Sequence, residues 1–195
     1  MQNIQRKSEF ILRLKTSISF SFYLFLIAII LAYFEVQIEG QNGWASALPT
    51  WKTTDPRLTW IFGGRPVTGY HLALNLLLLS FFHWPILFNK WTFINEAKVI
   101  SNFALLAVIW DFLWFVINPY FGLQNYNSEN IWWFSNWFLG FPIDYYFGIS
   151  MSIIIRCIPS FLRKEQFRNA LFEGVYFVVG CLLLTAIFVF IFQIL

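Results

Sequence analysis

Long apolar segments alternate with polar connections along the whole chain. A helix of about 20 apolar residues is long enough to cross a bilayer. We therefore expect an all-α polytopic membrane protein, with residues 1–195 forming a single transmembrane domain. Asn118 and Pro119 should end the third helix, because proline disfavours the helical conformation of the residue before it. The pattern predicts about five helices, at about 17–36, 67–88, 97–117, 139–158 and 171–195.

The composition supports the same class. Hydrophobic residues make up 58% of the chain and charged residues 12%, whereas soluble domains carry about 25% charged residues. The net charge is only +3, and no basic stripe follows any one segment, so we expect no nucleic-acid partner. The run at 17–36 is longer than the roughly 7–15 residues of a signal-peptide core, so we interpret it as a retained anchor.

Lys and Arg are distributed unequally between the two sides of the predicted bundle. With the N-terminus inside, only Lys52, Arg57 and Arg65 fall outside, and the other ten of the 13 basic residues fall inside. Cytoplasmic segments carry such an excess. We therefore expect the N-terminus inside and the C-terminus outside, in a multi-pass protein of a bacterial plasma membrane. The two outer loops are aromatic-rich, with Trp44, Trp51, Trp60, Trp132, Trp133 and Trp137.

Ionisable groups lie within or beside the apolar segments. Asp111 lies inside the third segment, and Asp144 and His71 lie near the ends of two others. An ionisable group in hydrocarbon costs several kcal/mol, so it is usually paired, functional or both. We predict that Asp111, Asp144 and His71 are the catalytic candidates, with Asp111 as the most deeply buried acid or base.

Further polar and aromatic residues fall at the same predicted depth, in the outer half of the membrane. His71 and Asn75 are one helical turn apart and share a face. Arg65 follows a pair of glycines at the mouth of the predicted site, where it would neutralise an acid or hold an anionic headgroup. The binding candidates are Glu35, Glu39, Arg65, Asn75, Trp114, Asn118, Tyr145 and Tyr146.

Four interpretations of this group remain open. A metal would take His71, Asp111 and Asp144, since imidazole and carboxylate oxygens are common ligands, although no HxxxH or ExxH spacing occurs. Acid–base chemistry on a lipid-soluble, isoprenoid-like substrate would use the same three residues. The third interpretation is binding without catalysis. The fourth is structural, with Asp111 joining neighbouring helices through hydrogen bonds.

The sequence favours a protein that binds or converts a lipid-soluble or amphipathic small molecule at an acidic, aromatic-lined pocket. The alternative is a non-catalytic accessory subunit of a membrane complex, in which Asp111 is a helix-packing residue. Whether the protein is an enzyme, and which cofactor it uses, stay open. The expected partners are membrane lipids and an apolar ligand, with a homo-oligomer or a partner membrane subunit left open. No motif assigns the chain to a family.

Overall fold

The computed structural model describes residues 2–59 and 62–194. The fold is all-α, as predicted, and its two small sheets are confined to the loops. The long helices are α1 (Gln2–Glu39), α3 (Gly69–Leu87), α4 (Phe93–Ile117), α5 (Ile143–Cys157) and α6 (Lys164–Ile194). The short elements are α2 (Pro56–Thr59), η2 (Leu123–Asn125), η3 (Ile158–Ser160) and the strands β1 (Lys52–Thr53), β2 (Val67–Thr68), β3 (Trp137–Phe138) and β4 (Phe141–Pro142).

Four helices of the described chain are long and apolar enough to cross a membrane, so this is a multi-pass membrane protein. They correspond to four of the five predicted segments. The fifth, at 139–158, contains α5, but this helix has only 15 residues and is about 22 Å long. A bilayer core is about 30 Å thick. The four candidate spans are Leu14–Glu39, Gly69–Leu87, Phe93–Ile117 and Gln166–Ile194.

Local sequence sets several helix ends. Thr68 caps α3 by accepting the backbone N–H of His71 at 3.1 Å, and Thr92 caps α4 by accepting that of Asn95 at 3.1 Å. Threonine oxygens commonly satisfy these free donors at helix N-termini. The end of α4 at Ile117 confirms the predicted stop before Pro119. The caps therefore place His71 in the first turn of α3.

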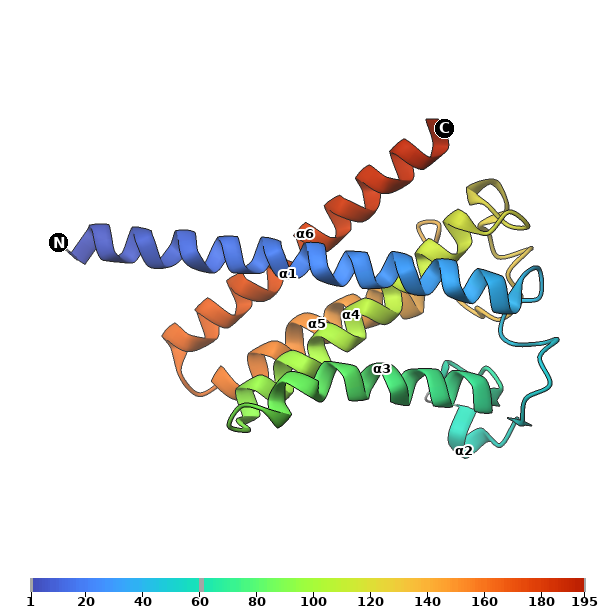
Figure 1. The fold of residues 1–195 in the computed structure, drawn as a ribbon, viewed down its shortest axis with the longest axis horizontal. Helices are drawn as coiled ribbons and strands as arrows, with labels where there is room; N and C mark the ends of the chain where they lie inside the picture. The colour runs from blue at the N-terminus through green and yellow to red at the C-terminus, as the bar shows by residue number, and fades with distance from the viewer. Residues whose placement is uncertain (1, 60–61, 195) are drawn as a thin grey trace.

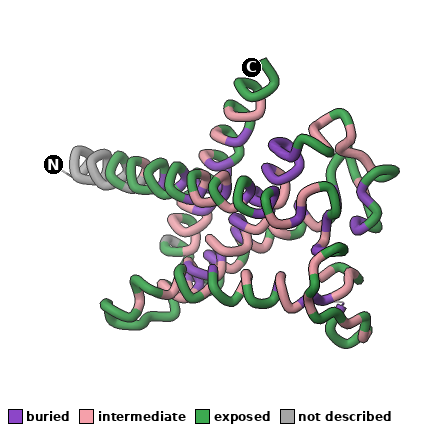
Figure 2. The backbone as a smooth tube through the Cα atoms, turned by 45° about the vertical axis from the view of Figure 1, so that its right-hand side comes forward, coloured by how far each residue is buried: buried purple, intermediate pink, exposed green. Residues whose placement is uncertain are grey.

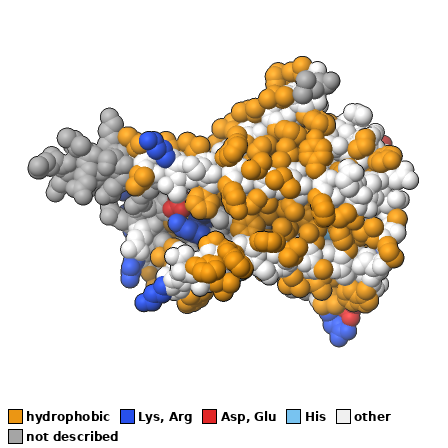
Figure 3. Space-filling view, in the orientation of Figure 1, with side chains coloured by type: hydrophobic (Ala, Val, Ile, Leu, Met, Phe, Trp, Pro, Cys, Tyr) orange, Lys and Arg blue, Asp and Glu red, His pale blue; other side chains and the backbone are white. Residues whose placement is uncertain are grey.

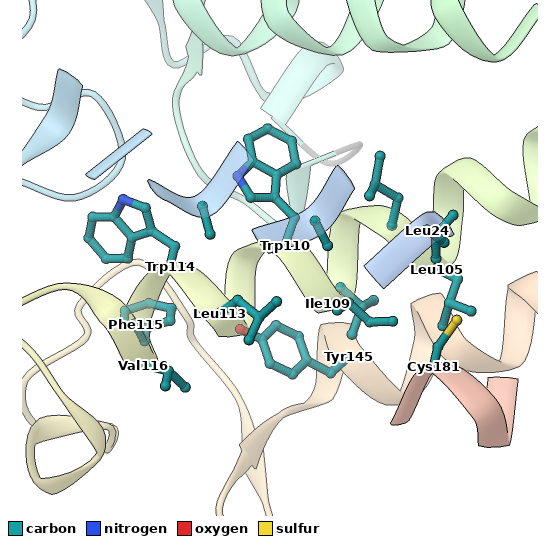
Figure 4. Close-up of a cluster of buried hydrophobic side chains, with 14 of the residues drawn as sticks. Leu24, Leu105, Ile109, Trp110, Leu113, Trp114, Phe115, Val116, Tyr145 and Cys181 are labelled. Carbon is teal, nitrogen blue, oxygen red and sulfur yellow. The ribbon is translucent and has the colours of Figure 1, made fainter. Parts of the chain in front are cut away.

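Helix α4 is the centre of the bundle. It packs against α5 and α1, and α1 also packs against α6. Figure 4 shows side chains of α4 meeting Leu24 of α1, Tyr145 of α5 and Cys181 of α6. The buried residues lie where the helices pack against one another, and the residues on the outer faces are exposed (Figure 2). Because α4 touches each neighbour, any side chain it presents lies near several helices.

Two glycines permit close helix contacts. A Cβ on Gly148 of α5 would lie 2.5 Å from the Val108 side chain of α4. A Cβ on Gly180 of α6 would lie 2.6 Å from Ser21 of α1. Small residues let helix backbones approach closely in membranes, where hydrophobic burial does not drive helices together. The α4–α5 contact thus depends on a glycine one turn after Asp144.

The two long loops, whose described residues are 40–59 with 62–68 and 118–142, lie at the same end of the bundle (Figure 1). We call this the loop end. The connections at 88–92 and 158–163 lie at the opposite end, as does the start of α1. Hydrophobic side chains cover the middle of the visible face, and Lys and Arg lie towards its two ends (Figure 3). This is the surface that a membrane protein presents to a bilayer.

Aromatic side chains pack the loop end. Trp133 stacks on Phe115 with ring centres 5.8 Å apart, and Phe121 meets both rings edge to face. A Cβ on Gly43 would lie only 2.1 Å from the Trp133 ring. The loop that follows α1 is therefore packed against the loop that follows α4. The two loops form one structured cap over the bundle.

Candidate functional site at the loop end

A cavity of about 540 Å³ lies at the loop end and continues between the helices. Its polar part is lined by four acids, one histidine and one arginine: Glu35, Glu39, Asp111, Asp144, His71 and Arg65. Its other part, which we call the groove, is lined by Ala104, Ala107, Val108, Gly148, Met151 and Ile155. The cavity therefore joins a concentrated polar cluster to an apolar channel on α4 and α5.

Two carboxylates come from the last turns of α1. Glu35 and Glu39 are one turn apart, which puts them on the same face of the helix. Both are buried, each with 7% of its surface exposed. Glu39 accepts the backbone N–H of Ala45 at 2.6 Å, and Glu35 accepts the Tyr70 hydroxyl at 3.3 Å. These bonds hold the carboxylates in the cavity without neutralising their charge.

His71 of α3 faces these carboxylates. Its Nε2 lies 3.5 Å from Glu39 Oε1, and its Nδ1 lies 2.8 Å from the Thr68 hydroxyl. The Trp44 ring stacks on the imidazole with ring centres 4.3 Å apart. A ring bonded at one nitrogen and stacked on one face has a fixed orientation. Its Nε2 is thereby directed towards the acids of α1.

The loop after α1 holds Trp44 in an unusual conformation. Trp44 and Ala45 have positive φ angles of 57° and 50°. Such angles cost non-glycine residues about 1–3 kcal/mol each, and they cluster at functional sites. Here the conformation lets Ala45 donate to Glu39 and lets Trp44 Nε1 donate to the Pro66 carbonyl at 2.7 Å. The strained loop thus fixes one acid and the stacking ring together.

Arg65 is the cation of this site. Its guanidinium lies between the rings of Trp44 and Phe134, 4.5 Å and 4.8 Å from their centres. Its Nη2 donates to Asp144 Oδ2 at 2.8 Å. The Arg65 side chain is 13% exposed, whereas that of Asp144 is 45% exposed. Arg65 therefore balances the charge of Asp144, which lies towards the edge of the site.

Asp111 lies on α4 and is half-buried. The hydroxyl of Tyr145 on α5 donates to Asp111 Oδ2. Asp111 also lies within electrostatic reach of Glu35 and Glu39. It therefore connects α5 to the acids of α1.

The charges in the cavity do not balance. Among the described residues, Glu35, Glu39 and Asp111 form no ion pair with a Lys or Arg. Arg65 is engaged by Asp144. Buried charges are costly unless they are paired. The site consequently needs protons, a cation or a ligand to offset its negative charge.

A buried donor at the cavity also lacks a partner. The indole nitrogen of Trp114 has no hydrogen-bond acceptor within the described chain, whereas that of Trp110 interacts with Glu35. Both residues line the cavity, with 6% and 2% of their surfaces exposed. Figure 4 shows both indoles projecting from α4 on the side where α1 passes. Buried polar groups are nearly always hydrogen-bonded in native proteins. An oxygen-bearing ligand in the cavity would supply the acceptor.

The predicted site residues fall into two groups. The cavity is lined by Asp111, Asp144, His71, Glu35, Glu39, Arg65, Asn75, Trp114 and Tyr145. Asn118 and Tyr146 lie elsewhere. Asn118 donates to the Gly40 carbonyl at 2.8 Å and so ties α4 to the loop after α1. Tyr146 donates to the Phe138 carbonyl at 2.9 Å. Both contacts are structural.

The structure brings together a different group of potential metal ligands from the predicted trio of His71, Asp111 and Asp144. In the described chain, the group of potential ligand atoms within 4.8 Å of one another belongs to Glu35, Glu39 and His71. Asp144 is held by Arg65 instead. The sequence placed all these residues at one depth, but depth alone does not give their rotation about the helix axes.

The sequence predicted an aromatic-lined pocket and named Trp44 and Trp133 in the outer loops, but its list of binding candidates left out four aromatic side chains of the site. Trp44, Trp110, Trp133 and Phe134 all line the cavity. The position of Trp44 could have indicated its role, because it follows Glu39 by five residues in the loop that leads to His71. Trp110 precedes Asp111, and its orientation towards α1 follows only from helix packing. Phe134 comes from the second loop, whose path the sequence pattern does not determine.

A larger cavity of about 1200 Å³ lies between α1, α3, α4 and α6, towards the opposite end. Of the four charged residues that line it, Lys90, Lys98, Arg156 and Glu173, the last three interact with one another. Arg156 donates to Glu173 at 3.1 Å and to Asn102 at 2.5 Å, and Lys98 also pairs with Glu173. The acid of this cavity is paired with two cations, whereas Glu35, Glu39 and Asp111 of the other cavity form no ion pair with Lys or Arg in the described chain. The cavity at the loop end is therefore the stronger functional candidate.

No protein-family model, no curated protein and no solved structure matches this chain significantly.

Proposed function

We propose that the protein binds an amphipathic, lipid-like molecule at the loop end and transfers a proton at its polar group. The observation that carries this proposal is the continuity of the cavity, which joins the acids and His71 to the apolar groove on α4 and α5. A molecule with a polar group and an apolar chain fits both parts. Pockets that combine an apolar lining with a few convergent polar groups are typical ligand sites.

The proposal includes an orientation in the membrane. We place the N-terminus inside and the loop end outside, in a bacterial plasma membrane, and we count α5 as a fifth crossing. The basic residues support this orientation. The antiparallel course of α5 beside α4, back to the opposite end, supports the fifth crossing. The site then lies in the outer half of the membrane.

The groove supports a ligand that enters from the lipid. Its floor is formed by small side chains, Ala104 and Ala107 of α4, which are half-buried. Lipid tails are as apolar as the groove, so entering it gains little hydrophobic free energy. The groove therefore discriminates between ligands by the shape of their apolar part. Most of the binding free energy comes from contacts with the polar cluster.

Asp111 and His71 are the groups that we propose for proton transfer. Asp111 already accepts a hydrogen bond from Tyr145, and both line the cavity. His71 faces the same space through Nε2. A carboxyl group and an imidazole held at fixed positions can act as acid and base on one bound molecule. The stacked Trp44 keeps the imidazole oriented.

The test is native mass spectrometry of the protein released from detergent or nanodiscs. Ala107→Phe places a ring in the groove and should lower the occupancy of a co-purified lipid at least tenfold, about 1.4 kcal/mol. Ala73→Phe is the matched control, because Ala73 is exposed on α3 and is not a residue of the groove. Equal occupancy in the two variants would contradict the proposal.

A second candidate function rests on the bond between Tyr145 and Asp111, which joins α5 to α4. In an accessory subunit this bond would serve helix packing alone. Asp111→Asn distinguishes the two. The accessory role predicts altered stability with unchanged lipid occupancy, whereas the proposed function predicts loss or exchange of the bound molecule.

A further inference from the structure

We propose that Glu35, Glu39 and His71 bind a divalent transition-metal ion inside the cavity. The inference deepens the proposed function and rests on it in one respect, since the same cavity holds the organic ligand. It assigns a metal to two acids at the end of α1 and the imidazole at the start of α3, in place of the predicted Asp111 and Asp144. With the ion bound, His71 Nε2 is a ligand, and the proton transfer falls to Asp111 alone.

The geometry suits one ion. The potential ligand atoms of the three residues lie within 4.8 Å of one another. His71 Nε2 and Glu39 Oε1 are 3.5 Å apart. Two tetrahedral ligands, each roughly 2.1 Å from one ion, are about 3.4 Å apart. The pair from His71 and Glu39 is therefore already at a ligand separation. Glu35 offers a carboxylate oxygen within 4.8 Å of both and would have to move closer to bind the same ion.

The ligand types select the metal. One imidazole nitrogen and two carboxylate oxygens suit Zn²⁺, Mn²⁺ or Fe²⁺. Ca²⁺ and Mg²⁺ prefer sites made of oxygen alone. Three protein ligands also leave a coordination position open, as in catalytic rather than structural zinc sites. Because all three residues line the cavity, the open position would be accessible to a ligand bound there.

The outer contacts of the three residues match those of metal ligands. A metal-bound histidine usually directs its other nitrogen to an oxygen, which fixes the ring. Here Nδ1 of His71 lies 2.8 Å from the Thr68 hydroxyl. Glu39 accepts from Ala45, and Glu35 accepts from Tyr70. Each ligand is thus held by a neighbour that carries no charge.

The charge of the cavity is an independent reason for a cation. Glu35 and Glu39 are buried beside Asp111, and none of them pairs with Lys or Arg in the described parts of the chain. A divalent ion offsets two of these charges. Each buried carboxylate otherwise remains a cost to the fold.

The unpaired indole of Trp114 is the second observation that points to a bound group. Trp114 lines the same cavity and is 2% exposed, with no acceptor for its N–H group in the described chain. An oxygen on the open coordination position, from water or from the organic ligand, is an acceptor of the required kind. The metal and Trp114 would then bind the same polar group.

The experiment measures metal on the intact protein in detergent, purified without chelators and exposed separately to Zn²⁺, Mn²⁺, Fe²⁺ and Co²⁺. Elemental analysis after dialysis should find about one ion per chain. Glu39→Gln and His71→Asn should each weaken binding by more than about 100-fold, since even the outer partners of metal ligands contribute about 10–100-fold. Glu96→Gln is the matched control, because Glu96 faces His83 at 2.9 Å at the opposite end.

Thermal unfolding separates ligand loss from misfolding. The ion should raise the Tm of the wild type and of Glu96→Gln, but not that of folded Glu39→Gln. Wild-type protein that takes up none of the four ions would overturn the inference. So would a site that Glu39→Gln and His71→Asn leave intact. Lipid occupancy is measured in the same samples. Protein that retains lipid but binds no metal would refute the metal site and leave the proposed lipid-binding function standing.

Discussion

Removing the Tyr145 hydroxyl should weaken the contact between α4 and α5 measurably. Tyr145→Phe deletes the donor to Asp111 and keeps the ring, which packs edge to face against Phe112 and Phe134. The ring contacts are therefore unchanged, and the effect reports the hydrogen bond. Interhelical bonds in membranes average about 0.6 kcal/mol and reach about 1.7 kcal/mol. A hydrogen bond to a carboxylate is stronger than one between neutral groups. We therefore expect Tyr145→Phe to lower the free energy of unfolding by about 1–2 kcal/mol.

The assay is reversible unfolding in mixed micelles, or the Tm in one detergent, where 1 kcal/mol corresponds to about 2–4 °C for a chain of this size. Tyr146→Phe is the matched control, because its exposed hydroxyl bonds only to a loop carbonyl. A double-mutant cycle with Asp111→Asn isolates the pair. A coupling energy below about 0.3 kcal/mol would show that the bond does not join the helices and would refute this reasoning.

Two further predictions concern the packing that shapes the site. Gly148→Ala should destabilise the protein by about 1–3 kcal/mol through overpacking, since its Cβ would lie 2.5 Å from Val108; Val108→Ala in the same chain should restore most of the Tm. Gly43→Ala should displace Trp133, whose ring lies 2.1 Å from the added Cβ. The intrinsic fluorescence spectrum should then shift, and lipid occupancy should fall while the helix content measured by circular dichroism stays constant.

The apolar runs predicted the helices well for a physical reason. A membrane-spanning helix must satisfy its backbone internally and present apolar side chains, so its sequence is recognisable without any partner. The ends at Ile117 and at the capping residues Thr68 and Thr92 also follow from local chemistry. The segment predicted at 139–158 begins too early. Leu139 and Gly140 form the turn between β3 and β4, and α5 begins only at Ile143.

The sequence predicted how deep in the membrane the site residues lie, but not which of them face one another. Position along each helix placed Asp111, His71 and Glu35 at one level, and the cavity contains all three. Which acids face His71 depends on the rotation of α1 and on the path of the loop after it. That path includes two residues with positive φ at Trp44 and Ala45, which no local pattern requires. Tertiary packing decides such positions.

The most direct test of the central claim is a cryo-electron microscopy map of the protein in lipid nanodiscs. We predict continuous density in the cavity, with a compact polar end between His71 and Asp111 and a chain lying over Ala107 in the groove. Extraction of the same sample should yield one amphipathic species. A cavity that contains only water-sized features, with ordered lipid solely on the outer surface of the helices, would contradict the proposed function.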